Sequence, residues 1–254
     1  MIADPDGVYF FHIPKTAGAS VYKAIDAAFD SSSICPCWLW DDLIDVPSDL
    51  LAGYKVFRGH FYGFFELFLG RQLRKFAILR EPVDRTVSYY HYIRNSVEHP
   101  NHADALALTL REFCLHDETR YLVENYQAGY LASLVLYTDP RAVAERFSAE
   151  EKKRHLFQAA LEPRTNGIAP NVLLDAALEG LSRLCAVGIS EQMDRSMELV
   201  SRAIGRTLAL PTERQNVTPD RISVKQLDAA TLQTVEEITA VDRFIYRHIE
   251  ARYR

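Results

Sequence analysis

Residues 8–20 read VYFFHIPKTAGAS, and this stretch decides the fold. The β-branched and aromatic residues at 8–13 predict a buried strand that is stopped by Pro14. Small residues then form a short turn, and residues 21–29 carry apolar side chains at helical spacing. This order of strand, tight loop and helix is how a parallel α/β sheet begins.

The rest of the chain repeats the alternation of strand and helix. Short apolar strands are predicted at 54–57, 75–79 and 184–189. Helices are predicted over residues 82–93, 106–114, 122–136, 140–161, 191–204 and most of 223–254. We therefore expect an α/β fold with a mostly parallel central sheet, flanked by helices on both faces and with extra helices in the C-terminal half. Neither a repeat nor a low-complexity linker divides the chain, so we expect one domain over 1–254.

The composition limits the kind of partner. The chain has 254 residues and a net charge of −5 at pH 7, so it has no general attraction for nucleic acid or for an anionic membrane. Any anion site must be made locally, by a few cationic side chains and backbone amides. Asp4 and Asp6 stand where a signal peptide would be basic, and the first apolar run, 8–11, is too short for a membrane span. We expect a cytoplasmic protein without a membrane span.

The four cysteines do not have the spacing of a zinc site. Cys35 and Cys37 are one residue apart and lie close to two tryptophans, whereas Cys114 and Cys185 stand alone. Zinc or a disulfide at 35 and 37 is conceivable, but this spacing favours free thiols, which suits a reducing compartment.

Residues 12–20 have the features of a phosphate-binding loop between a strand and a helix. Small residues let backbone N–H groups approach an anion, and the helix N-terminus adds a partial positive charge. Lys15 supplies a full charge, while Thr16 and Ser20 supply hydroxyl groups. The loop differs from that of standard NTPases, because Lys15 precedes Gly18 and the required upstream glycine is missing. An ordinary strand-to-helix turn is the alternative interpretation.

A second set of polar residues follows the strand at 75–79. Arg80 stands at the strand end, where its planar guanidinium could donate two parallel hydrogen bonds to a phosphate. Ser88 lies two turns into the following helix and could reach the same anion from the side of the helix. Arg85 is interpreted as a brace for the helix. Alternatively, both arginines are solvated surface charges.

Both stretches resemble signatures of one family. The string His-Ile-Pro-Lys-Thr-Ala-Gly at 12–18 resembles the 5′-phosphosulfate loop of carbohydrate-type sulfotransferases, in particular heparan sulfate 2-O-sulfotransferase-like enzymes and their bacterial relatives. The pattern Arg-x-Pro-x-x-Arg-x-x-Ser-x-Tyr at 80–90 is similar to the 3′-phosphate signature of that family. The resemblance implies a P-loop-like three-layer domain of bacterial origin that binds 3′-phosphoadenylyl sulfate (PAPS) and releases adenosine 3′,5′-bisphosphate (PAP).

The resemblance also implies roles for individual residues. Lys15 would contact the bridging oxygen of the donor, and Arg80 and Ser88 would bind its 3′-phosphate. The 5′-phosphate would be held by Thr16, Ala17, Gly18, Ala19 and Ser20.

His60, in the string Phe57-Arg58-Gly59-His60 that ends the second strand, is the candidate base. Its ordinary pKa of about 6.5 suits proton abstraction at neutral pH, and relatives use a histidine after glycine at this place. A histidine that only hydrogen-bonds within an aromatic loop is the alternative, and Glu66 and Glu81 are the next candidates for the base.

Three weaker resemblances lie further along the chain. Residues 125–127 begin a segment that often continues with arginine in relatives, where this chain has Ala128, and residues 187–191 resemble the family's later strand and turn. Arg214, in a stretch that resembles the loop closing over the donor, is a candidate contact for a donor phosphate.

The sequence thus predicts transfer of a sulfuryl group from PAPS to a hydroxyl or amine, on a carbohydrate or a small metabolite. His60 and Lys15 would be catalytic, and we expect no metal because no acidic cluster is suited to Mg²⁺. Two alternatives stay open: a P-loop-type nucleotide kinase, which would need ATP and Mg²⁺, and a non-catalytic nucleotide-binding protein.

Overall fold

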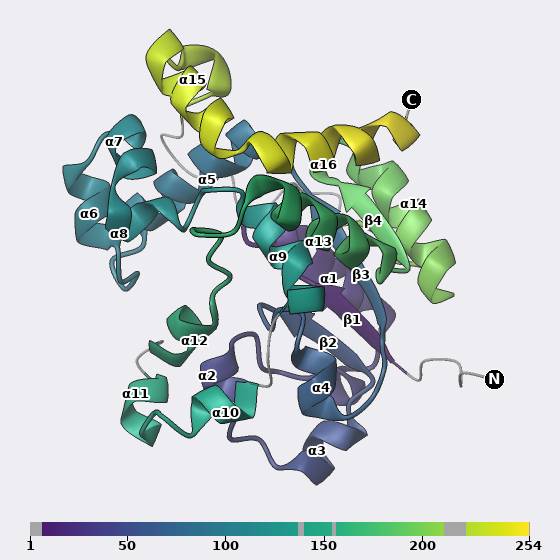
Figure 1. Ribbon diagram of the computed structural model, residues 1–254. Helices are drawn as coiled ribbons and strands as arrows, with labels where there is room; N and C mark the ends of the chain where they lie inside the picture. Colours follow the sequence, from purple (N-terminus) through teal and green to yellow (C-terminus); the bar gives the residue numbers. More distant parts are fainter. Residues whose placement is uncertain (1–6, 137–139, 154–155, 211–221, 254) are drawn as a thin grey trace.

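The computed structural model describes residues 7–136, 140–153, 156–210 and 222–253. Four parallel strands lie side by side in the middle of the molecule, in the order β2-β1-β3-β4 (Figure 1). Their bounds are β1 Val8–Phe11, β2 Val56–Gly59, β3 Arg74–Leu79 and β4 Ala186–Ile189. Because every strand runs in the same direction, all four carboxyl ends lie at one edge of the sheet.

Helices cover both faces of this sheet. In β1, Val8 and Phe10 point into a core shared with α1 (Gly18–Ala28) and α14 (Met193–Ile204). Tyr9 and Phe11 point into the opposite core. That second core is shared with the helices α9 Tyr126–Leu136, α13 Pro170–Ser182 and α16 Ala240–Glu250. Alternation along one buried strand therefore produces three layers, as predicted.

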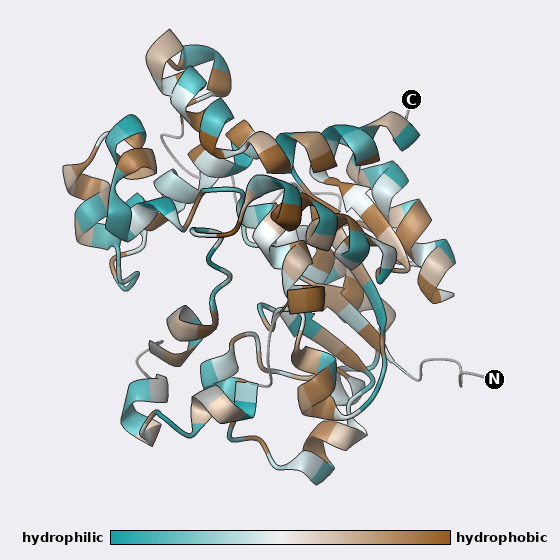
Figure 2. Cartoon of the chain, viewed as in Figure 1, coloured by the Kyte–Doolittle hydropathy of each residue, from teal (hydrophilic) through white to brown (hydrophobic). Residues whose placement is uncertain are grey.

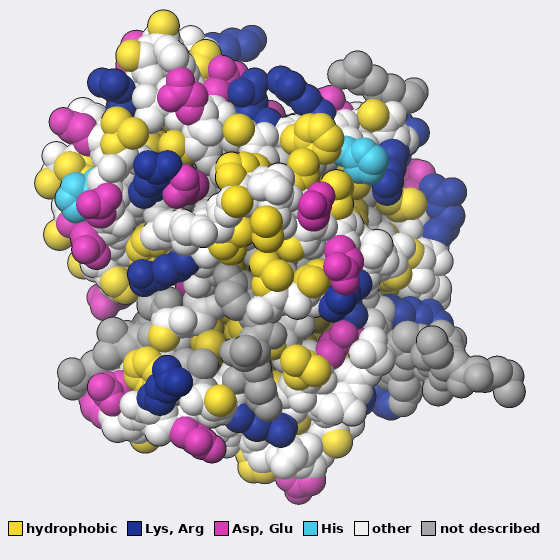
Figure 3. All heavy atoms as spheres, viewed as in Figure 1, with side chains coloured by type: hydrophobic (Ala, Val, Ile, Leu, Met, Phe, Trp, Pro, Cys, Tyr) yellow, Lys and Arg dark blue, Asp and Glu magenta, His cyan; other side chains and the backbone are white. Residues whose placement is uncertain are grey.

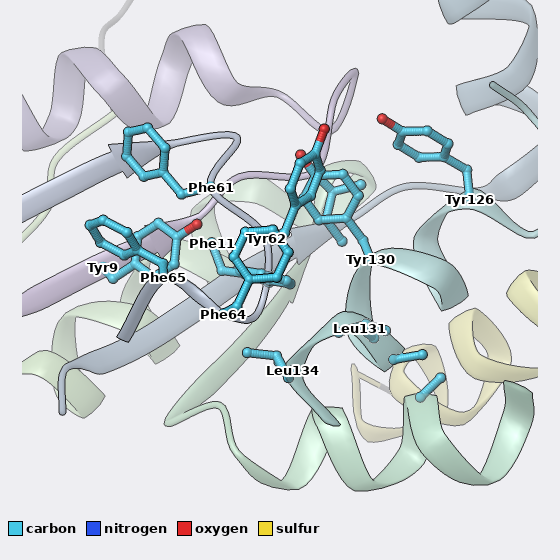
Figure 4. Packing of buried hydrophobic residues seen from close by; sticks show 14 of the residues in the cluster. Tyr9, Phe11, Phe61, Tyr62, Phe64, Phe65, Tyr126, Tyr130, Leu131 and Leu134 are labelled. Atoms are coloured by element: carbon cyan, nitrogen blue, oxygen red, sulfur yellow. The ribbon is translucent and has the colours of Figure 1, made fainter. Parts of the chain in front are cut away.

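The second core is rich in aromatic rings. Figure 4 shows Phe11, Tyr62 and Tyr130 packed together, with ring centroids of Tyr130 5.4 Å from Phe11 and 4.9 Å from Tyr62. Gly180 in α13 lets that helix approach α9 closely, because a Cβ there would lie 2.1 Å from the carbonyl oxygen of Leu131. Hydrophobic residues accordingly colour the strands and the inward sides of the helices in Figure 2.

A group of helices stands beside the sheet with a hydrophobic cluster of its own. It is built on α5 (Pro82–Asn95) and buries residues such as Val87, Phe113 and Val235. The other members of this group are α6 His102–Ala107, α7 Leu110–Leu115, α8 Asp117–Arg120 and α15 Ala229–Ile238.

Short helices fill the remaining connections. They are α2 Trp40–Leu43, α3 Ser48–Gly53, α4 Phe65–Leu69, α10 Pro140–Ala144, α11 Ala149–Lys153 and α12 Leu156–Leu161. Single 3₁₀ turns occur at Ser31–Ser33, Ser190–Gln192, Val224–Gln226 and Ala251–Tyr253.

Three of the predicted helices are broken. The prediction for 106–114 was wrong at Thr109, which leaves the helix and starts α7 with a reciprocal cap to Glu112. The region 140–161 is interrupted at 145–148, between α10 and α11, and the C-terminal region breaks at Thr239 between α15 and α16. Helix α13 was not predicted.

On the face seen in Figure 3, Lys and Arg side chains are interspersed with Asp and Glu, so this face has no large patch of one charge. Within the described ranges, no helix has both the length and the apolar character needed to cross a bilayer.

Candidate functional site

The carboxyl edge of the sheet brings the predicted residues together. Strand β1 is central, and the residues that follow β1, β2 and β3 there are His12, His60 and Arg80. The chain goes from β1 to β2 on one side and then to β3 on the other. Ligands of open α/β sheets bind at such a reversal.

The loop after β1 has the backbone shape of an anion-binding nest. Lys15 and Ala17 have φ values of 69° and 68°, and Thr16 between them is not among the residues with positive φ. Alternating backbone handedness points successive N–H groups into one concavity, and α1 begins immediately after it. Residues other than glycine reach this conformation at a cost of about 1–2 kcal/mol each, and such strain concentrates at functional sites.

Gly18 is required by its contact with His12. A Cβ on Gly18 would lie 2.0 Å from Nε2 of His12, so the imidazole packs directly against the first residue of α1. The other nitrogen, Nδ1, is 2.8 Å from the hydroxyl of Tyr22, one turn into the helix. His12 therefore holds the end of β1 against the start of α1 and fixes the shape of the loop.

The hydroxyl of Thr16 is used inside the loop. Thr16 is fully buried and donates its hydroxyl proton to the carbonyl of Ile13 at 2.8 Å. This hydroxyl has only one proton to donate, so the predicted contact of Thr16 with a phosphate stays a prediction. The half-buried Ser20 lies in the first turn of α1, where its N–H is hydrogen-bonded to the carbonyl of Ala17 at 3.1 Å.

Arg80 joins the two predicted phosphate motifs. Its NH1 group donates to the carbonyl of Lys15 at 3.0 Å and to the hydroxyl of Ser88 at 3.2 Å. On its other side, Nε and NH2 contact the carboxylate of Asp84 at 2.8 and 2.5 Å. The ammonium of Lys15 lies 4.4 Å above the ring of Tyr92 on α5. Cationic groups from both motifs thus lie against α5, the helix that follows β3.

Arg85 is buried and supports the loop as well as its own helix. Its Nε donates to the carbonyl of Pro14 at 3.1 Å, and its terminal nitrogens reach the carbonyl of Leu122 at 3.4 Å. The guanidinium stacks over Tyr126 with 4.0 Å to the ring centroid. The prediction that it braces the structure agrees with these contacts.

The backbone of Arg80 is fixed from α9. The amide of Gln127 pairs with both backbone groups of Arg80, at 3.0 Å to its N–H and 2.9 Å to its carbonyl. The N–H groups of Gln127 and Ala128 donate to the buried carboxylate of Asp242 on α16, at 3.1 and 2.7 Å. Burial raises the pKa of Asp242 to about 6 although these hydrogen bonds lower it.

His60 is held in one tautomer. Its Nδ1 lies 2.8 Å from the carbonyl oxygen of His12, which can only accept, so Nδ1 carries the proton. In the neutral ring Nε2 then has the free lone pair that a base needs. The rings of His12 and His60 lie 4.4 Å apart, so two separate strand ends meet there.

The pKa values of both histidines are lowered, which favours the neutral form of each ring. Burial lowers the pKa of His60 to about 4, and the hydrogen bond to the carbonyl of His12 offsets part of that shift. Burial also lowers the pKa of His12 well below its ordinary value, and the nearby His60 and Lys15 add to this effect. At neutral pH both rings are therefore uncharged, and the lowered pKa makes each of them a weaker base than a solvated imidazole.

The two alternative carboxylates are committed elsewhere. Glu66 forms an ion pair of 2.6 Å with Lys75, near the amino end of β3 and thus at the opposite edge of the sheet from His60. Glu81 caps α5 by accepting the N–H of Asp84 at 2.7 Å. These contacts argue against Glu66 as the base and give Glu81 a structural role.

Three further predictions concern Arg214, the thiols of Cys35 and Cys37, and a metal site. Arg214 lies outside the described residues. The thiols of Cys35 and Cys37 are buried and unbridged. Among the described residues, no group of three or more His, Cys, Asp or Glu side chains is arranged to hold a metal ion.

The sequence matches no protein-family model and no curated protein. Among solved structures, this chain is similar to the mouse sulfotransferase SULT7A1 complexed with PAP. The two are 16% identical, the match covers 95% of this chain and 85% of the mouse chain, and the TM-score is 0.33.

Sequence reasoning missed the residues that position the site. His12 was treated only as part of the loop string, and neither Gln127 nor Asp242 was expected to support Arg80. One signal for His12 was available, because a histidine followed by a glycine six residues later can pack on the helix start. The pairings of Gln127 and Asp242 span long stretches of sequence and leave no local signal.

Proposed function

We propose that this chain acts as a single sulfotransferase domain that transfers a sulfuryl group from PAPS to a hydroxyl or amine, on a carbohydrate or a small metabolite. The observation that carries the proposal is the position of the Arg80 guanidinium, between the carbonyl of Lys15 and the hydroxyl of Ser88. Through that side chain, the loop after β1 and the helix after β3 form one anion site.

The geometry supports a donor with two phosphate groups. The nest at 15–17 and the first turn of α1 suit the 5′-phosphosulfate, whose oxygens would meet backbone N–H groups of 16–19 and the hydroxyl of Ser20. Arg80 and Ser88 suit a 3′-phosphate on the β3 side of the loop. Phosphate would compete with Asp84 for Arg80, and a bidentate dianion is the stronger partner.

The chemistry requires one proton transfer and one displacement. The acceptor oxygen or nitrogen bonds to sulfur while the bond from sulfur to the bridging phosphate oxygen breaks, and PAP leaves. Nε2 of His60 takes the acceptor proton. Lys15 and the loop N–H groups stabilise the charge that develops on the leaving oxygen. A positioned base contributes about 10²–10⁴ in rate.

The direct test is transfer of labelled sulfate from PAPS to a panel of glycans, lipids, amines and phenols. We expect a labelled product and an equal amount of PAP, with His60→Ala slowing turnover about 10²–10⁴-fold and leaving PAP affinity within about twofold. Binding of PAP without any transfer would favour the non-catalytic alternative. Binding of ATP with Mg²⁺ in preference to PAP would favour the kinase alternative.

A further inference from the structure

An exposed indole is connected to the candidate base by a continuous series of contacts. The side chain of Trp38 is 56% exposed, and its ring meets that of Tyr22 edge-on with centroids 6.1 Å apart. The hydroxyl of Tyr22 lies 2.8 Å from Nδ1 of His12, whose ring lies 4.4 Å from that of His60. The carbonyl of Trp38 also accepts the backbone N–H of His60 at 2.8 Å.

The segment that carries Trp38 is anchored on both sides. Before it, the N–H of Cys35 donates to the carbonyl of Val56 at 2.8 Å, so the chain runs along β2. After it, Trp40 is fully buried and packs against a group of phenylalanines. A Cβ on Gly59 would lie 2.5 Å from the Trp38 carbonyl, which shows how closely the two backbones approach. The exposure of this indole is therefore not the result of a loose loop.

The position of Trp38 separates it from ordinary exposed apolar residues, which are common when scattered singly. Arg80 and the ammonium of Lys15 are directed toward α5, on the β3 side of the loop. Trp38 and His60 lie on the β2 side. Trp38 is thus an exposed aromatic side chain that adjoins the candidate base on the side away from Arg80.

We propose that the exposed face of Trp38 is a stacking surface for a sugar ring of the acceptor. This inference rests on the proposed function and specifies the acceptor class for the same site. A pyranose has one apolar C–H face that can lie on an indole, and its hydroxyl rim can stay in water. A phenol, apolar on both faces, is better held in an enclosed slot. Trp38, with 56% of its side chain exposed, offers an open face and not such a slot.

The test measures binding of a ring without requiring transfer. PAP-loaded protein is titrated with chitotetraose, cellotetraose and a desulfated heparan tetrasaccharide, with sorbitol as an open-chain polyol and p-cresol as a phenol. We expect at least one oligosaccharide to bind and to protect tryptophan fluorescence from acrylamide, since Trp38 is exposed and the chain's other tryptophan, Trp40, is buried. Trp38→Ala should weaken that binding about tenfold, and Trp38→Phe less than about threefold.

The control is Phe244→Ala, since this ring on α16 is 55% exposed and lies outside the proposed site. It should change neither oligosaccharide nor PAP binding. Equal oligosaccharide binding by wild type and Trp38→Ala, binding of p-cresol alone, or no binding of any ring compound would overturn the inference. Those outcomes are separate from failure of the proposed function, which appears as loss of PAP binding or of sulfate transfer in the wild type.

Discussion

Arg80 is placed by three different parts of the chain: the loop after β1, helix α5 and helix α9. Its guanidinium contacts the carbonyl of Lys15, the hydroxyl of Ser88 and the carboxylate of Asp84, and Gln127 pairs with its backbone. Such a fixed planar fork is suited to a phosphate, and lysine cannot reproduce it.

Replacing Arg80 by lysine should weaken PAP binding and spare AMP binding. Losing one charge-assisted hydrogen bond costs about 1.5–3 kcal/mol, which corresponds to about 10–100-fold in PAP affinity. AMP lacks the 3′-phosphate, so its affinity should change less than about threefold. Isothermal titration calorimetry measures both affinities.

The matched control is Arg183→Lys, since Arg183 also forms an ion pair with a carboxylate four residues away, Glu179 at 2.6 Å. That variant should bind PAP like the wild type. An equal loss of PAP and AMP affinity in Arg80→Lys would mean that Arg80 shapes the loop and does not bind the 3′-phosphate directly.

The pH dependence of transfer should be displaced toward acid. His60 must be neutral to accept a proton, and burial lowers its pKa from the ordinary 6.5 to about 4. The acid limb of kcat/KM is therefore expected well below pH 6. Since buried neutral histidines take up protons on unfolding, the free energy of unfolding should fall as the pH drops from about 6.5 to about 4.

Rates must accordingly be divided by the folded fraction, measured by circular dichroism at each pH. An acid limb centred near 6.5 in the corrected profile would show that the base is a solvated group and not His60, whose pKa is lowered by burial.

The local residues of the site were predictable, and their supports were not. Lys15, Arg80, Ser88 and His60 each follow a strand in sequence, so their approach at one edge follows from parallel pairing. Thr16 was predicted as a donor because its side chain type allows it. Its commitment to the carbonyl of Ile13 depends on the turn geometry, which the residue type does not specify.

At the scale of the element, the loop and α1 depend on the absence of a side chain at Gly18. A Cβ there would meet the imidazole of His12 at 2.0 Å, whereas a Cβ on Gly53, at the end of α3, would meet nothing within 4 Å. The two glycines therefore separate the effect of the contact from the general effect of adding a methyl group.

Gly18→Ala should displace His12 and distort the nest. We expect a loss of about 1–3 kcal/mol in the free energy of unfolding, typical of overpacking, together with at least tenfold weaker PAP binding. Gly53→Ala should stay within about 1 kcal/mol of wild type and bind PAP normally. Urea unfolding and calorimetry measure the two effects, and normal PAP binding by Gly18→Ala would contradict the assigned role of His12.

Helices were harder to predict than strands. The strands β1 and β3 are short apolar runs, the first stopped by Pro14 and the second followed by the charged Arg80. Their ends were therefore predicted to within two residues. Helix α13 has apolar residues at Leu173, Ala176, Ala177 and Gly180, which is a helical spacing that the prediction overlooked. The break at Thr109 could have been found from the capping pair with Glu112.

At the scale of the whole molecule, the C-terminal helix supports the site at the N-terminal strand. Asp242 on α16 accepts the first N–H groups of α9, and Gln127 on α9 holds the backbone of Arg80. In return, Asn125 before α9 accepts the N–H of Val241 at 2.9 Å. No part of this connection is visible in local sequence, because its partners are 47 to 116 residues apart.

Asp242→Ala should therefore affect both stability and binding. Two buried N–H groups would lose their acceptor, at a cost of about 1–3 kcal/mol each in the free energy of unfolding. We expect PAP affinity to fall severalfold because Gln127 is released. The control, Asp228→Ala, removes an exposed cap from α15 and should cost about 1 kcal/mol without changing PAP affinity. Unchanged PAP binding in Asp242→Ala would contradict the connection.

The measurement that tests the central claim most directly is a comparison of PAP, AMP and ATP binding by calorimetry, with EDTA and with Mg²⁺. A site made of the nest, Lys15, Arg80 and Ser88 should bind PAP in EDTA about a hundredfold more tightly than AMP, since the 3′-phosphate adds a charge-assisted contact. Mg²⁺ should not make ATP the better ligand. Equal affinities for PAP and AMP, or tighter binding of ATP with Mg²⁺ than of PAP, would contradict a PAPS site on this chain.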